Sequence, residues 1–202
     1  MNPYIVVDKF EEALCEYTGA KHAVATSSCT ASLILACDYL KVQRVSIPKF
    51  TYISVPMAII HAGGQVQFEN TKWRGLYQLK PYPVWDSARY FTSGMHKKGQ
   101  IMCVSFRWAK ILDIGQGGAI LHDDPEADRW FRKARFNGRT AGVDPRDDTF
   151  VMGYPFNMMP RDAAEGLTRL SYLPKHNEPL PNDDCTDLSR IELWSSHKDK
   201  ER

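Results

Sequence analysis

The sequence has no apolar run of about 18 residues, the length that a membrane-spanning helix requires. Its first residues also lack the pattern of a secretory signal peptide. Charge of one sign is scarcely in excess, since 26 Lys and Arg stand against 24 Asp and Glu. A strongly basic surface for nucleic acid or anionic lipid is therefore not expected. These absences predict a cytoplasmic protein with no nucleic-acid partner and no membrane partner.

Cysteine and histidine are too scattered to form a recognisable metal motif. The five cysteines show no CxxC spacing, and the six histidines are dispersed, so we predict no metal site. Cys15, Cys37 and Cys103 fall within apolar patterns, which is typical of buried thiols in a reducing compartment.

What the sequence does contain is a regular alternation of short apolar runs and helical patterns. Because the strands are apolar throughout and alternate with helices, they predict an α/β fold, a three-layer sandwich with a mostly parallel sheet covered on both faces. Asp8 and Glu11 resemble a capping box for the first helix. The predicted strands are 22–28, 44–48, 65–70, 83–88, 101–106 and 117–124, and the predicted helices are 7–20, 30–40, 52–64, 125–136 and 159–173.

Two features of chain organisation stand out. Residues 1–173 carry these elements and form one predicted domain, whereas 174–202 read as a polar C-terminal tail. Between the strands at 65–70 and 83–88 there is no convincing helix, although a parallel crossover normally needs a dozen or more residues. This crossing is therefore minimal, or the two strands are not simple neighbours.

Polar groups follow three of the predicted strands, at the sheet edge where open α/β folds bind ligands. Ser28 and Thr30 stand where a strand gives way to a helix, Asp86 ends a strand, and Lys110 follows a strand and precedes a cluster of glycines. Taken singly, each has a structural explanation. A serine can cap a helix, a carboxylate can hold a turn, and a lone lysine is usually a solvated loop residue.

Together the three groups match the requirements of pyridoxal 5'-phosphate. A lysine forms a Schiff base with its aldehyde, a carboxylate keeps its ring nitrogen protonated, and a helix N-terminus binds its phosphate. Tyr52, after the strand at 44–48, offers an aromatic face for the ring.

Five segments between Val7 and Leu173 resemble the DegT/DnrJ/StrS aminotransferases. These are fold-type I enzymes that place amino groups on nucleotide-linked keto sugars. The glycine cluster and its lysine resemble the family's Ser-Phe-His-x-x-Lys and Gly-Glu-Gly-Gly motifs, and WDSA resembles Glu-Asp-Ala-Ala. The five segments are FEEALCEYTGAKHAVATSSCTASLILA, IPKFTYISVPMAIIHAGGQVQF, WDSA, SFRWAKILDIGQGGAILHDD and MGYPFNMMPRDAAEGLTRLSYL.

The resemblance implies a fold like the PLP-dependent transferase large domain and a role for each site residue. It implies that Lys110 is the catalytic Schiff-base lysine, that Asp86 is the ring-nitrogen partner and that Tyr52 is the stacking ring. Arg107 replaces a family histidine, and two roles stay open for it: phosphate binding or pairing with Asp113 on the surface. The other positions implied to bind cofactor are Ser28, Cys29 and Ser105 at the phosphate, and Arg89, which stands where relatives have Gln or His beside the ring oxygen.

The departures from the family pattern define the alternatives. Pro155 and Asn157 replace the Asn and Arg of the family's Asn-x-Arg motif, Gln116 replaces a Glu, and most of the C-terminal small domain is missing. We therefore predict a shortened, homodimeric aminotransferase that uses a nucleotide-linked sugar and an amino donor. The alternative is a non-catalytic or degenerate PLP-fold protein that acts as a binding or assembly subunit. Sugar dehydration is a further possibility, but that subgroup usually replaces the lysine with histidine.

Overall fold

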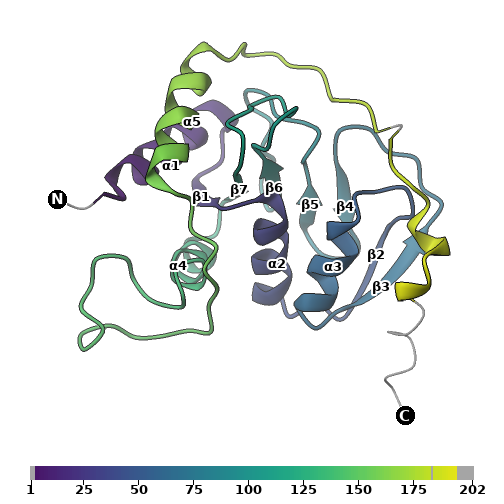
Figure 1. Ribbon diagram of the computed structural model, residues 1–202, viewed down its shortest axis with the longest axis horizontal. Helices are drawn as coiled ribbons and strands as arrows, with labels where there is room; N and C mark the ends of the chain where they lie inside the picture. Colours follow the sequence, from purple (N-terminus) through teal and green to yellow (C-terminus); the bar gives the residue numbers. More distant parts are fainter. Residues whose placement is uncertain (1–2, 183, 195–202) are drawn as a thin grey trace.

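The computed structural model describes residues 3–182 and 184–194 (Figure 1). Each predicted helix and strand is present, with ends within three residues of the expected ones. The helices are α1 (Ile5–Thr18), α2 (Cys29–Tyr39), α3 (Ser54–His61), α4 (Pro125–Ala134) and α5 (Pro160–Tyr172). The strands are β1 (His22–Thr26), β2 (Arg44–Pro48), β3 (Gln65–Glu69), β4 (Tyr77–Leu79), β5 (Val84–Asp86), β6 (Ile101–Ser105) and β7 (Gly118–His122).

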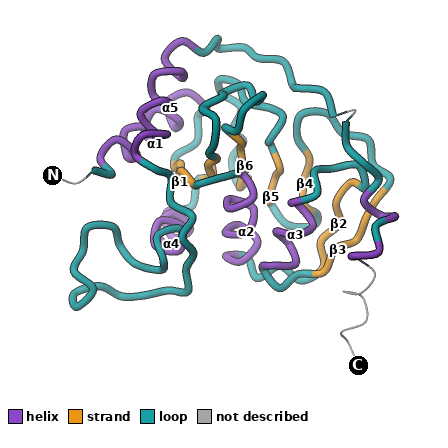
Figure 2. The backbone as a smooth tube through the Cα atoms, viewed as in Figure 1, coloured by secondary structure: helices purple, strands orange, loops and turns teal. Residues whose placement is uncertain are grey.

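The strands form a five-stranded sheet in the order β1-β7-β6-β5-β4 and a parallel pair β2-β3 (Figure 2). A single antiparallel bridge between Ser46 and Lys80, with N–H···O distances of 2.8 and 3.1 Å, joins the two. The pairings give β1, β2, β3, β5 and β6 one direction and give β4 and β7 the other. Five strands thus share one direction, but three of the four pairings in the five-stranded sheet are antiparallel, so this sheet is mixed rather than mostly parallel as expected. The pairing is mixed, because among the described strands only β5–β6 and β2–β3 are parallel neighbours.

Strand β4, which was not predicted, explains the short crossing between β3 and β5. A chain that leaves the end of β3 without a helix can re-enter the sheet at once only by running back antiparallel. β4 does so, and it forms a hairpin with β5 in which Tyr77 lies opposite Asp86. The strands β3 and β5 are therefore not neighbours in the sheet, which was one of the two interpretations of the sequence.

Helices and loops cover the two faces of the sheet, as a three-layer fold requires. Successive strand residues alternate between the faces, so Val24, Cys103 and Ile120 pack with α2, α3 and α4. Their strand neighbours, such as Ala25 and Val104, pack with α1, α5 and the loops that follow β5 and β6. Figure 1 shows α2 and α3 side by side in front of the sheet, with α1 and α5 together at its β1 end.

The predicted capping box of the first helix is wrong. Helix α1 begins after Tyr4 with no side-chain cap, and Asp8 lies inside its first turn. Glu11 is instead buried, accepts a hydrogen bond from Ala25 N and forms ion pairs with Arg132 and Arg135. A buried carboxylate needs such partners, so this glutamate joins α1 to β1 and α4 rather than capping its own helix.

The C-terminal segment crosses the carboxyl edge of the sheet to reach the far side of the molecule (Figure 1). Backbone hydrogen bonds attach it to the loops after β5 and β2, from Leu180 N to Arg89 O and from Leu188 N to Lys49 O. It ends in two short 3-10 helices, Leu188–Arg190 and Glu192–Trp194, in which Leu188 and Trp194 are buried. Residues 174–182 and 184–194 are therefore packed on the domain, while Asp183 and 195–202 of the predicted tail lie outside the described residues.

The cysteines are all free. Cys37 and Cys103 are buried as expected, Cys29 is buried as well, and Cys15 is only half-buried. None of the helices described here is both long and apolar enough to cross a membrane.

Candidate functional site

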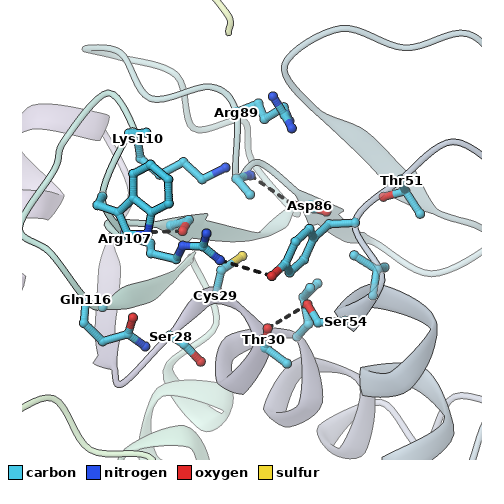
Figure 3. A pocket seen from close by; sticks show the side chains of 18 of the residues that line it. Ser28, Cys29, Thr30, Thr51, Ser54, Asp86, Arg89, Arg107, Lys110 and Gln116 are labelled. Atoms are coloured by element: carbon cyan, nitrogen blue, oxygen red, sulfur yellow. Dashed lines mark hydrogen bonds between the residues drawn. The ribbon is translucent and has the colours of Figure 1, made fainter. Parts of the chain in front are cut away.

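A pocket of about 450 Å³ opens at the carboxyl edge of the sheet (Figure 3). Residues that follow β1, β2, β5 and β6 converge on it, as ligand sites do in open α/β sheets. All eight residues that were predicted to bind the cofactor line this pocket: Ser28, Cys29, Tyr52, Asp86, Arg89, Ser105, Arg107 and Lys110.

The start of helix α2 forms one wall of the pocket. The Ser28 hydroxyl caps the helix by accepting a hydrogen bond from Ala31 N at 3.1 Å. The N–H groups of Cys29 and Thr30 belong to the first turn, where helix geometry gives them no intrahelical partner. Such N–H groups, together with the helix dipole, favour an anion.

Gly118 allows β7 to pass directly against this wall. A Cβ atom at Gly118 would lie 2.5 Å from Ser28 C and from Cys29 N, which is closer than a real Cβ approaches backbone. Gln116 adds a further tie, because its Nε2 donates to Ser27 O at 3.0 Å. The two residues fix the loop before α2 against the β6–β7 connection.

Asp86 is buried at the end of β5, with both carboxylate oxygens engaged. Ala88 N donates to Oδ1 and the Tyr77 hydroxyl donates to Oδ2, each at 2.9 Å. Burial raises the pKa of Asp86, while these two hydrogen bonds and the charge of Lys110 oppose the rise. The site therefore supports a carboxylate that can pair with a cationic group of a ligand.

Lys110 lies in the loop after β6 and extends across the pocket toward Asp86 (Figure 3). The carboxylate of Asp113 shapes this loop by accepting hydrogen bonds from Ala109 N and Gly115 N, at 3.0 and 2.8 Å. Burial and then the charge of Arg89 lower the pKa of Lys110, against the opposing charge of Asp86. A lowered pKa makes the neutral, nucleophilic amine more accessible.

Arg107 lies between two aromatic side chains at the pocket mouth. Its Nη1 donates to the Tyr52 hydroxyl at 3.1 Å, and its guanidinium lies 5.2 Å from the centre of the Trp108 ring. The Asp113 carboxylate is used by backbone N–H groups instead of Arg107. This leaves the arginine facing the pocket, where phosphate binding stays its predicted role.

Arg89 is directed toward the C-terminal segment. Its guanidinium donates to Pro181 O and forms an ion pair with Asp184, which also lines the pocket. The predicted place of Arg89 beside the cofactor ring stays a prediction.

Sequence reasoning missed Tyr77, which donates to Asp86, and Thr51, which lines the pocket. Both are buried, and their hydroxyl oxygens are 2.5 Å apart. Tyr77 was missed because its strand has only three residues, too few for a period-two pattern to be recognised in the sequence. Its only signal was the unusually short crossing between β3 and β5.

The fold and pocket together define a class of protein. The α/β sandwich, with a helix start suited to an anion, a buried carboxylate and an amine at one sheet edge, is the large-domain fold of fold-type I PLP-dependent transferases. The chain belongs to the DegT/DnrJ/EryC1/StrS aminotransferase family, whose model matches residues 2–77 and 88–179.

Individual relatives agree with this assignment. A UDP-4-amino-4,6-dideoxy-N-acetyl-beta-L-altrosamine transaminase of Campylobacter jejuni is 25% identical over 217 residues, covering 85% of this chain and 57% of the relative. The structure of AtS13 from Actinomadura melliaura superposes with a TM-score of 0.72 at 20% identity, over 83% of this chain and 60% of that one. The structure of NtdA from Bacillus subtilis, which contains the cofactor PMP, superposes with a TM-score of 0.69 at 18% identity. The match covers 83% of this chain and 48% of that one. The chain thus spans between about half and three fifths of the length of these relatives.

The family match is interrupted at residues 78–87. This interval contains most of the β4–β5 hairpin, including Asp86. The two matched ranges, in contrast, include the start of α2 and the Lys110 loop.

Proposed function

We propose that this protein is a pyridoxal 5'-phosphate-dependent aminotransferase that acts on a nucleotide-linked keto sugar, with an amino acid as the amino donor. The observation that carries the proposal is the convergence of Lys110, Asp86 and the start of α2 on one pocket. The family assignment and the Campylobacter UDP-sugar transaminase support the substrate class. We place the enzyme in the cytoplasm.

The residues present fit this cofactor in chemistry and in size. Pockets of a few hundred Å³ are typical for small ligands, and this one measures about 450 Å³. Its first-turn N–H groups suit a phosphate, its buried carboxylate suits a protonated ring nitrogen, and its amine suits an aldehyde. Bound pyridoxal phosphate supplies an aldehyde that captures amines and a ring that accepts electrons from the neighbouring carbon.

Each residue has a defined role in this proposal. Lys110 holds the cofactor covalently and then moves a proton at the substrate carbon, for which its lowered pKa is suited. Asp86 binds the ring nitrogen and Tyr52 covers the ring. Ser28, Cys29, Ser105 and Arg107 would hold the phosphate, and Arg89 would face the ring oxygen.

We also propose that the protein acts as a homodimer. The loop between α4 and α5 extends away from the body of the molecule (Figure 1). It exposes large apolar side chains, which soluble proteins commonly cover by association. Those exposed by more than a third are Val143, Phe150, Met152 and Met159. Light scattering over a range of concentrations should give twice the chain mass, and a strictly monomeric protein would contradict the dimer.

Absorption spectroscopy tests the catalytic proposal. The protein incubated with pyridoxal 5'-phosphate should turn yellow and retain the colour on a desalting column, and an L-amino acid donor should bleach it. Lys110→Ala is the matched control and should lose the retained colour. A colourless wild-type protein would instead favour the alternative, a non-catalytic binding or assembly subunit.

A further inference from the structure

We propose that Tyr77 is a positioning residue for Asp86: it keeps this buried carboxylate ionised and oriented toward the cofactor, and Thr51 holds Tyr77 in the required orientation. The inference deepens the proposed function and rests on it. No part of the family resemblance assigns a role to either hydroxyl.

The hydrogen bonds allow a single direction for the protons. An ionised carboxylate can only accept, so the 2.9 Å contact requires Tyr77 to donate its one hydroxyl proton to Asp86 Oδ2. The hydroxyl of Thr51, 2.5 Å away, must then donate to the Tyr77 oxygen. A hydroxyl that accepts a hydrogen bond becomes a stronger donor, so Thr51 strengthens the bond to Asp86.

The hairpin places Tyr77 where this contact is unavoidable. Tyr77 and Asp86 are directly opposed in the antiparallel β4–β5 pairing, so their side chains lie on the same face of the sheet. The Tyr77 ring packs at 4.7 Å from the Trp73 ring, which limits its movement. Tyr77 and Asp86 are exposed by only 6% and 5%, so water cannot readily replace the hydroxyl as a donor.

The surroundings of Asp86 make a donor at Oδ2 necessary. Burial favours the neutral acid, and a neutral acid cannot pair with a protonated ring nitrogen. Lys110 and Arg89 are the cations that act on the carboxylate, and the thiols of Cys29 and Cys103 stay neutral because burial raises their pKa well above the ordinary value. Ala88 N serves the other oxygen, Oδ1. Tyr77 is therefore the side-chain donor that stabilises the charged form at Oδ2.

The first experiment needs no cofactor. The pKa of Asp86 is measured from the side-chain carboxyl resonance of isotope-labelled aspartate, assigned by its loss in Asp86→Asn. Tyr77→Phe keeps the ring and removes only the donor, so the pKa of Asp86 should rise by about one pH unit or more, as expected for a hydrogen bond to a charged group. Thr51→Val should raise it by less. An unchanged or lower value in Tyr77→Phe would overturn the proposal, and Thr51→Val provides the same comparison if Tyr77→Phe does not fold.

The second experiment tests whether the contact between Tyr77 and Asp86 affects cofactor binding. The dissociation constant of pyridoxal 5'-phosphate is measured between pH 5 and 8 by tryptophan fluorescence. Binding should weaken at acid pH as Asp86 takes up a proton, and in Tyr77→Phe this weakening should begin at a higher pH than in the wild type. At a pH where Asp86 is ionised in the wild type but protonated in the variant, the variant should bind about tenfold less tightly. A uniform loss at every pH would indicate a merely structural role and would contradict the proposal. If the wild type binds no cofactor, the proposed function fails, and the resonance measurement still decides the role of Tyr77.

Discussion

The carboxylate of Asp113 accepts a 3.0 Å hydrogen bond from the backbone N–H of Ala109, the residue immediately before Lys110. Ala109 has a φ of 64°, a left-handed conformation that non-glycine residues rarely adopt. Asp113→Ala should therefore release this loop, lower the free energy of unfolding by about 1–2 kcal/mol and slow the attachment of cofactor to Lys110 several-fold. The rate of attachment is measured by borohydride reduction at successive times and mass mapping of the modified peptide.

A matched control for this variant is Asp144→Ala. Asp144 also accepts from a backbone N–H two residues on, that of Arg146 at 2.9 Å, but it lies in the loop between α4 and α5 rather than in the loop that carries Lys110. It should leave the rate of attachment unchanged. Equal slowing in the two variants would show that Asp113 has no specific influence on Lys110.

Gly118 should be intolerant of even one methyl group. Gly118→Ala would push a Cβ into the Ser28–Cys29 backbone, so we expect a loss of about 1–3 kcal/mol in the free energy of unfolding. Because that backbone opens α2, phosphate-bearing ligands should also bind less tightly. Gly166→Ala makes a comparable overlap with the Phe10 ring and should destabilise without affecting ligand binding. Calorimetry and a titration with pyridoxal 5'-phosphate separate the two effects.

The pH dependence of cofactor attachment should report the amine of Lys110. The neutral amine is the reactive form, and burial and Arg89 lower its pKa, so the rate should reach its plateau at a lower pH than for an ordinary lysine. Arg89→Gln removes a lowering charge and should move the midpoint to higher pH. Asp86→Asn removes a raising charge and should move it to lower pH. Midpoints that shift in the same direction in both variants would disprove this account of the electrostatics.

Asp128 should contribute to the loss of stability in acid. Burial raises the pKa of Asp128, but two neighbouring side chains lower it to about 2. His122 Nε2 lies 3.7 Å from Asp128 Oδ1, and Arg132 Nε donates to Asp128 Oδ2 at 2.7 Å. The unfolded chain therefore takes up a proton between about pH 4 and pH 2 that the folded protein does not. Stability should fall over this window by about 2 kcal/mol more in the wild type than in Asp128→Asn. Urea denaturation at pH 4, 3 and 2 measures the difference.

The arrangement of the predicted elements was accessible from sequence because each carries a strong local signal. Apolar strands such as 101–106 and the amphipathic helix after Pro125 need no tertiary information to be recognised. The pocket residues followed because polar groups at strand ends meet at one edge of an α/β sheet, and the resemblance to the family added their predicted roles.

The remaining features depend on contacts between distant parts of the chain. Glu11 resembles a capping residue locally, yet two arginines about 120 residues away decide its position. Tyr77 becomes part of the site only because β4 runs antiparallel beside β5. The docking of the C-terminal segment likewise depends on isolated contacts, such as the ion pair of Asp187 with Lys49, that polar composition cannot predict.

The pairing of β1 with β7 also constrains the order in which the site forms during synthesis. His22 lies opposite His122, so β1 waits for a partner strand that is 122 − 22 = 100 residues further along the chain. At roughly 5–20 residues per second this interval lasts many seconds on the ribosome. During that time the loop at Ser28 lacks strand β7, whose first residue, Gly118, packs against it in the folded protein. The pocket wall that we propose binds the phosphate is therefore completed only after β7 has emerged, and a nascent chain arrested before Gly118 should retain no cofactor.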